Sequence, residues 1–170
     1  MLKSKRHPFT VLINTGIFIL LFLFHYSVSG SIAIKNATPF LMLPMLTAFS
    51  MFYSTSAAFW TGLACGIAAD GIVNGTNLFS TIVLTVTAVM TSLIAQYLFN
   101  RNIRAAVVLS LLGNLFYFLM RWLVFYAFGN GITNSALYLM DYALPSALYS
   151  TVFIIPFYFL EKYIHSKLPE

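Results

Sequence analysis

The chain has 170 residues, of which 60% are hydrophobic and 8% are charged. A soluble domain carries about 25% charged residues because its surface must stay hydrated, so this composition excludes an ordinary soluble enzyme or binding domain. The net charge of +5 does not indicate nucleic-acid binding, because the basic residues lie beside apolar runs, where membrane topology explains them. We expect an all-α integral membrane protein with a single transmembrane domain over residues 1–170.

The first half of the chain holds three apolar runs. Residues 9–29 form the first predicted span and follow a basic start. This run is longer than the roughly 7–15 apolar residues of a signal peptide, which favours an uncleaved helix. Residues 39–53 and 56–69 form the second and third spans, joined by a tight hairpin. Both are shorter than the usual span of about 20 residues, so we expect them to lie among other helices or to thin the bilayer locally.

Three longer runs follow in the second half of the chain. An Asp-Gly turn over residues 70–77 leads into the fourth predicted span, residues 78–99. The fifth span covers residues 105–128 and the sixth covers residues 142–163. The sequence therefore predicts six transmembrane helices connected by short loops.

The orientation of these spans follows from the basic residues, which accumulate on the cytoplasmic side of a membrane. With both termini in the cytoplasm, seven of the nine basic residues are cytoplasmic: Lys3, Lys5, Arg6, Arg101, Arg104, Lys162 and Lys167. Lys35 then lies outside and Arg121 lies within a helix. We therefore predict a multi-pass protein with its N- and C-termini inside.

Small residues recur along the third span. Ala58, Gly62 and Gly66 repeat every four residues, and Asp70 continues the same stripe. In lipid, small side chains allow two helix backbones to approach closely. We interpret these four residues as a helix-packing face or as a partner contact. Packing against a helix of the same chain is one reading, and contact with another protein's transmembrane helix is the other.

The fifth span places four polar residues on one helical face: Ser110, Asn114, Tyr117 and Arg121. A charged side chain inside a span normally faces a bundle interior or a cavity, unless it reaches the interface. Of the four acids, Glu161 and Glu170 belong to the predicted cytoplasmic end. We therefore favour an architectural pair of Arg121 with Asp70 or Asp141, with snorkelling to the outer interface as the alternative.

Two prolines interrupt the sixth span. Pro145 and Pro156 each remove a backbone hydrogen bond and favour a kink. Hydroxyl groups at Ser146, Ser150 and Thr151 can satisfy the carbonyls that a kink frees. We include Pro145 and Ser146 among the candidate packing or partner-contact residues.

No pattern in the chain indicates a catalytic, cofactor or metal site. An intramembrane aspartyl protease needs two carboxylates facing each other inside helices, whereas Asp70 and Asp141 sit at predicted outer helix ends. Metalloprotease and serine-hydrolase motifs do not occur, and the chain has a single cysteine, Cys65. We therefore expect a protein that is not an enzyme and that needs no cofactor.

Two segments resemble a known family. Residues 62–70 (Gly-Leu-Ala-Cys-Gly-Ile-Ala-Ala-Asp), followed by a polar turn with Gly75 and Asn77, resemble the central signature of the rod shape-determining protein MreD family. Residues 144–158 are similar to that family's closing segment. The chain departs from the pattern at Ser150, where Asn is more usual, and at Arg121.

The resemblance implies a location and a role. Proteins of the MreD family are multi-pass proteins of the bacterial cytoplasmic membrane that take part in cell elongation. They bind the bitopic membrane protein MreC and help to couple MreB filaments to peptidoglycan synthases. The resemblance also implies a six-helix fold similar to the substrate-binding S components of energy-coupling-factor vitamin transporters.

Those S components are the alternative function. They dock a coupling subunit through small residues on the first helix, whereas here the first predicted span has only Thr15 and Gly16 as small residues near its middle. The predicted outer loops are short and offer few groups to fix a small polar ligand. These features favour a membrane scaffold over a solute-binding subunit.

Overall fold

The computed structural model describes residues 37–72, 78–97, 102–127 and 138–167, together with residues 16, 17, 20 and 25. The predicted first span, residues 9–29, lies outside the described residues apart from those four positions. The protein is all-α, as expected from the sequence.

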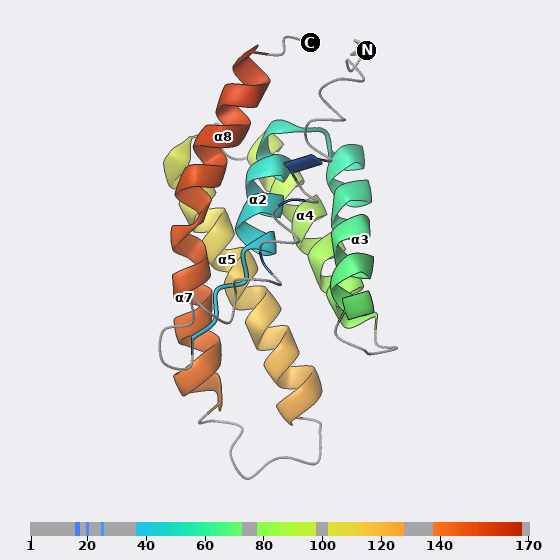
Figure 1. Cartoon of the computed structure of the whole chain (residues 1–170), viewed down its shortest axis with the longest axis vertical. Coiled ribbons are helices and arrows are strands. Elements are labelled where there is room, and N and C mark those ends of the chain that lie inside the picture. Colours follow the sequence, from blue (N-terminus) through green and yellow to red (C-terminus); the bar gives the residue numbers. More distant parts are fainter. Residues whose placement is uncertain are drawn as a thin grey trace.

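The helices follow one another along the chain with short connections (Figure 1). In chain order, the described helices are α2 (Met42–Phe52), α3 (Thr55–Ile72), α4 (Phe79–Tyr97), α5 (Ile103–Trp122), the π-helix η1 (Leu123–Ala127), the π-helix η3 (Leu139–Ala143), α7 (Leu144–Val152) and α8 (Ile154–Lys167). The second, third and fourth predicted spans therefore each correspond to one helix, the fifth to α5 with η1, and the sixth to η3, α7 and α8 in succession, all with shifted ends.

Three helical stretches are long and apolar enough to cross a membrane: Phe79–Tyr97, Ile103–Phe125 and Leu139–Ser166. They indicate a multi-pass membrane protein. The apolar helix α2 has 11 residues, which gives it a length of about 16 Å, well short of a hydrocarbon core of about 30 Å. The described residues therefore contain three candidate spans, and the total of six stays a prediction.

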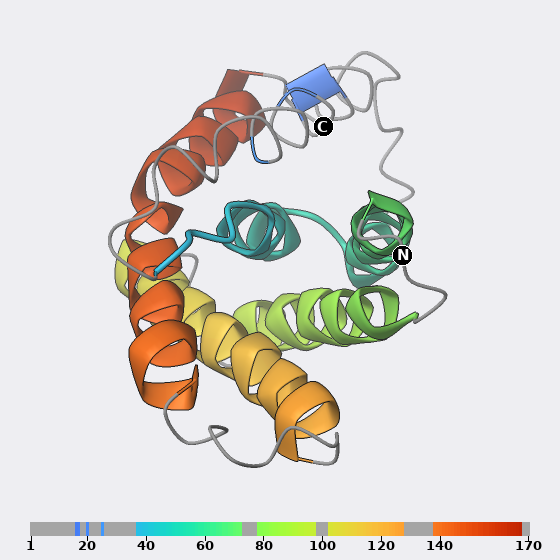
Figure 2. The ribbon, with the colours of Figure 1, turned by 60° about the horizontal axis from the view of Figure 1, so that its bottom comes forward.

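Helix α2 lies in the middle of the bundle. All of its residues are buried, and Figure 2 shows α3, α4, α5 and the α7–α8 pair arranged around it. Its predicted start at residue 39 was too early, because residues 38–40 are not helical and the helix begins at Met42. The expectation that a short second element is buried among its neighbours is confirmed.

Local sequence accounts for the ends of α2. Pro44 stands in the first turn, where a backbone N–H has no partner within the helix and proline is tolerated. At the other end, Tyr53 takes an extended conformation, and its N–H donates to the Phe49 carbonyl at 3.1 Å. The chain then turns within Tyr53 and Ser54 and enters α3. This short link confirms the predicted tight hairpin.

Both prolines of the last span lie where the helix changes. Pro145 follows the π-helix η3 directly, at the start of α7. Pro156 stands in the first turn of α8, and the helix breaks just before it, where the Phe153 N–H bonds to the Ser150 carbonyl at 3.2 Å. A proline ring excludes the carbonyl four residues earlier from helical hydrogen bonding, which explains the break.

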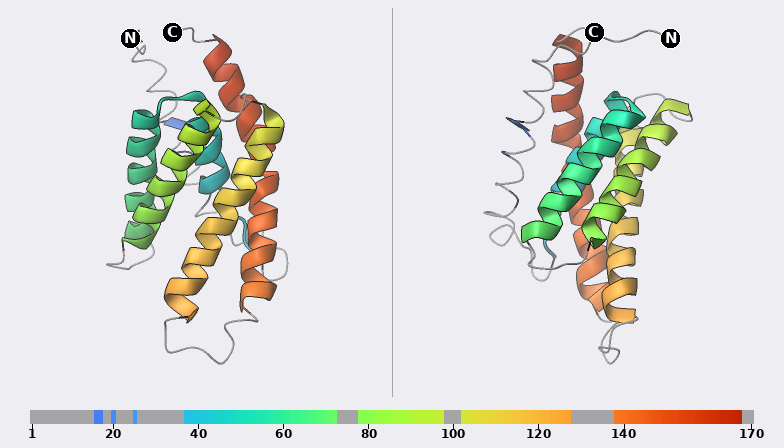
Figure 3. Two further views of the ribbon diagram at one scale, coloured as in Figure 1. Left: turned by 180° about the vertical axis from the view of Figure 1, so that it is seen from behind. Right: turned by 90° about the vertical axis from the view of Figure 1, so that its right-hand side faces the viewer.

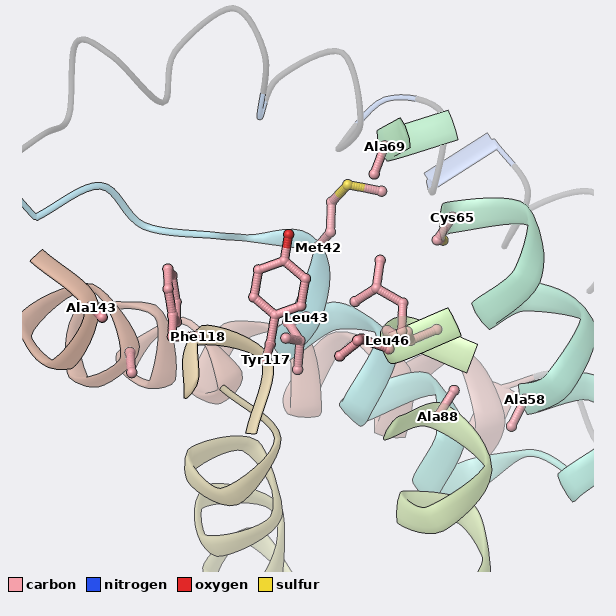
Figure 4. Packing of buried hydrophobic residues seen from close by; sticks show 13 residues of the cluster. Met42, Leu43, Leu46, Ala58, Cys65, Ala69, Ala88, Tyr117, Phe118 and Ala143 are labelled. Atoms are coloured by element: carbon pink, nitrogen blue, oxygen red, sulfur yellow. The ribbon is translucent and has the colours of Figure 1, made fainter. Parts of the chain in front are cut away.

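The core contains two clusters of buried side chains. One joins α2 to α3, α4, α5 and α7, and Figure 4 shows Leu43 and Leu46 of α2 among Tyr117 of α5, Ala88 of α4 and Ala58 of α3. The other joins the far half of α2 to α5 and α8. Helix α2 therefore contributes to both clusters, which explains its complete burial.

Candidate functional site

The small residues of α3 face α4. The two helices run side by side in both views of Figure 3. A Cβ atom added at Gly62 would lie 2.9 Å from the Thr85 Cα and 3.0 Å from the Ala88 Cβ. One added at Gly66 would lie 2.9 Å from the Thr81 backbone N. The close approach expected of this stripe therefore exists, and the neighbour is a helix of the same chain.

The α4 surface that receives the glycines is itself built from small residues. Ser80, Thr81, Thr85 and Ala88, together with the backbone carbonyl of Leu84, supply the atoms nearest to Gly62 and Gly66. Ala58 of the same α3 stripe is fully buried. Small residues on both helices allow many dispersion contacts over the whole length of the pair.

Asp70 ends the stripe by capping α4. Its carboxylate accepts hydrogen bonds from the Ser80 N–H at 3.0 Å, from the Thr81 N–H at 2.8 Å and from the Thr81 hydroxyl at 2.8 Å. The first N–H groups of a helix have no partner within the helix, and a negative charge there interacts favourably with the helix dipole. Asp70 thus joins the end of α3 to the start of α4.

The opposite end of the α3–α4 pair is also joined by polar groups. Gln96 of α4 donates from Nε2 to the Ser92 hydroxyl at 2.8 Å and to the Tyr53 carbonyl at 3.3 Å. The Thr55 and Ser92 hydroxyl groups lie 3.4 Å apart. Helices α3 and α4 are therefore held by hydrogen bonds at both ends and by glycine contacts between them.

A second junction attaches the segment before α2 to the last span. The Ser146 hydroxyl accepts the Thr38 N–H at 3.1 Å, and the Ser150 hydroxyl accepts the Phe40 N–H at 2.8 Å. The Thr38 hydroxyl and the Tyr142 hydroxyl lie 2.7 Å apart. Non-helical backbone inside a membrane protein needs such partners, because no water is present to supply them. The candidate residues Pro145 and Ser146 thus lie beside the attached segment.

The polar face of α5 lines the interior near this junction. Asn114 is fully buried, and its Nδ2 donates to the Ser110 carbonyl at 2.9 Å and to the Thr151 hydroxyl at 3.4 Å. The Tyr117 ring stacks on the Phe40 ring with centroids 4.7 Å apart. The residues predicted to share one face of the fifth span therefore point into the bundle as far as Tyr117.

Arg121, in the last turn of α5, lies on the same helical face and is half-buried. Asp70 directs its hydrogen bonds to Ser80 and Thr81 of α4. Asp141 is exposed on η3. The pair of Arg121 with Asp70 or Asp141 stays a prediction.

Sequence reasoning placed Glu161 at the cytoplasmic end of the chain, but the structure buries its side chain, with 1% exposed. The pattern of α8 contains the signal, because Phe157, Tyr158 and Ile164 share its face and are buried as well.

In the part of the chain that the structure describes, no group of three His, Cys, Asp or Glu residues could hold a metal ion. No known protein family, curated protein or solved structure matches the chain.

Proposed function

We propose that the chain is a membrane scaffold of the bacterial cell-elongation machinery that binds an MreC-like bitopic membrane protein. In this role it helps to couple MreB filaments to peptidoglycan synthesis, and it acts by helix packing rather than by catalysis. The proposal follows the resemblance of residues 62–70 and 144–158 to the MreD family.

One observation carries the proposal. The residues on which the resemblance rests connect elements of the bundle. Gly62 and Gly66 pack against α4, Asp70 hydrogen-bonds to α4, and Ser146 of α7 hydrogen-bonds to the segment before α2. Because these residues connect helices to one another, they support a protein whose activity is to hold helices in a fixed arrangement. An enzyme or a solute carrier would be expected to place some of these groups around a ligand.

We propose that a partner helix binds on the outer surface of the bundle, and the packing of α3 supports this choice. Gly62 and Gly66 are occupied by α4, so a partner would contact the outer surface of the bundle. On α4 that surface carries a stripe of exposed apolar side chains one turn apart: Ile82, Val86 and Met90. We assign the partner helix to the bundle's apolar exterior, where it would compete with lipid. The packing of α3 against α4 would then hold that surface in place.

Copurification after mild detergent extraction tests the proposal. The tagged chain is expressed in a rod-shaped bacterium, and the captured proteins are identified by mass spectrometry. A bitopic membrane protein with a coiled-coil region, captured at near-equal amount, would support the scaffold. Capture of an ATPase pair in its place would favour the S-component alternative and overturn the proposal.

A matched pair of variants sharpens this experiment. Gly62→Leu removes the α3–α4 approach, whereas Gly71→Leu adds the same side chain at a position of α3 where an added Cβ has no atom within 4 Å. We expect Gly62→Leu to lose the partner and Gly71→Leu to keep it. Retention of the partner by a folded Gly62→Leu variant would show that the binding surface does not depend on this joint.

A further inference from the structure

Glu161 is a buried acid that the scaffold role does not use. It stands on α8 within the candidate span Leu139–Ser166. Its side chain is 1% exposed, and neither carboxyl oxygen has a hydrogen-bond partner in the part of the chain that the structure describes. Buried polar groups normally have such partners, so this carboxyl group requires an explanation.

The surroundings of Glu161 are apolar and aromatic. Phe52, at the end of α2, contacts the Tyr158 ring with centroids 5.5 Å apart and the His165 ring with centroids 5.7 Å apart. Tyr158 and His165 lie on α8 on either side of Glu161, so the Phe52 ring lies across the same part of α8. Glu161 therefore faces the last turn of α2.

The elements packed against α8 place little charge near this position. Helices α2, α5 and α7 contact α8. Helix α2 contains no ionisable side chain, and α7 contains only Tyr149. On α5, Arg104 in the first turn is exposed, and Arg121 stands in the last turn.

On α8 itself, four further titratable side chains lie within one turn of Glu161. Lys162 and Tyr163 are exposed, Tyr158 is buried and His165 is half-buried. Neither Tyr158 nor His165 hydrogen-bonds to the carboxyl group of Glu161. Among the described residues, a carboxylate ion at this position would have no counter-ion, and it would face the carbonyl end of α2, which carries partial negative charge. Burying a charge in that way is strongly unfavourable.

We propose that Glu161 is a proton-binding site, whose carboxyl group holds a proton while α8 is packed against α2 and releases it when that contact opens. The proton exchanges with solvent, and no other reactant is required. Because Glu161 lies in the part of α8 nearest the predicted cytoplasmic end, the pH of that compartment sets the strength of the α2–α8 contact. This site is independent of the scaffold role.

Unfolding of the full-length protein in detergent at several pH values tests the proposal. The folded protein holds one more proton than the unfolded chain, so the wild type should lose stability as the pH rises from about 5.5 to about 8.5. Glu161→Gln keeps the shape and removes the ionisable proton. We expect it to unfold several degrees above the wild type at the highest pH, with a flatter dependence on pH. Groups that titrate alike in both proteins cancel in the difference between them.

Two further variants complete the experiment. Glu161→Met should also fold, because the site offers a polar side chain no hydrogen-bond partner. Ser166→Ala removes an exposed hydroxyl group of the same helix and should leave the pH dependence of the wild type unchanged. The proposal is overturned if Glu161→Gln fails to fold or unfolds below the wild type at high pH, because Glu161 would then be a paired carboxylate. Equal slopes against pH for the wild type and Glu161→Gln would overturn it as well.

Discussion

Asp70, near the end of α3, accepts both the backbone N–H and the hydroxyl group of Thr81, in the first turn of α4, at 2.8 Å each. A single carboxylate thereby caps a helix to which it does not belong. The contact therefore caps α4 and connects it to α3 at the same time.

Removal of the Asp70 carboxylate should weaken the bundle. Asp70→Ala leaves two N–H groups of α4 without their partner, and we expect a loss of about 1–2 kcal/mol in the free energy of unfolding. Asp70→Asn keeps an acceptor without the charge and should lose less. Lys162→Ala, at an exposed charged residue, is the control and should change stability by no more than about 0.5 kcal/mol. Thermal unfolding in detergent measures all three, and equal behaviour of the two alanine variants would contradict the cap.

Alanine substitutions of the three α3 glycines should separate packing from helix propensity. Gly66→Ala puts a Cβ against the Thr81 backbone, which cannot move aside, so we expect a loss of about 1–3 kcal/mol. Gly62→Ala should lose somewhat less, because its contacts are longer. Gly71→Ala meets no atom within 4 Å and should be neutral or stabilising by up to about 1 kcal/mol, since alanine favours helix. A stabilised Gly66→Ala variant would show that α3 and α4 are not in close contact.

The hydroxyl groups of Ser146 and Ser150 should stabilise the segment before α2. Each alanine variant leaves one partly buried N–H, of Thr38 or Phe40, without an acceptor, and we expect each to lower the free energy of unfolding by about 1–2 kcal/mol. Because both act on the same short segment, the double variant should lose less than the sum of the single variants. Ser166→Ala removes an exposed hydroxyl and should have little effect. Strict additivity would mean that Thr38 and Phe40 detach independently.

The six-span topology predicts the location of two reporters. An enzyme reporter fused after Glu170 should be active in the cytoplasm, and one inserted at Gly131 should be active outside, because seven basic residues lie on the predicted inner side. Paired phosphatase and fluorescent fusions measure both positions. A cytoplasmic signal at Gly131 would overturn the six-span arrangement while leaving the three candidate spans in place.

The sequence alone determined the class of the protein and the position of most helices. Long apolar runs with few charges can only be stable as helices in lipid, because every backbone group must be satisfied within the segment. For the same reason, residues 78–99 and 105–128 were predicted within a few residues of the ends of α4 and of the combined α5 and η1. Spacing also placed Gly62, Gly66 and Asp70 on one face, since helical periodicity depends only on residue number.

Only the tertiary structure decided what those faces contact. The spacing of Gly62 and Gly66 is the same whether the neighbour is α4 or a partner protein, and the acceptor role of Asp70 depends on Ser80 and Thr81 lying across the turn. Glu161 was assigned to the cytoplasmic end because it follows an apolar run and precedes Lys162. Its burial accompanies the packing of Phe52, which is far away in sequence, against Tyr158 and His165 of the same helix. In a membrane protein the lipid-facing and the packed sides of a helix are both apolar, so the residue pattern alone does not distinguish them.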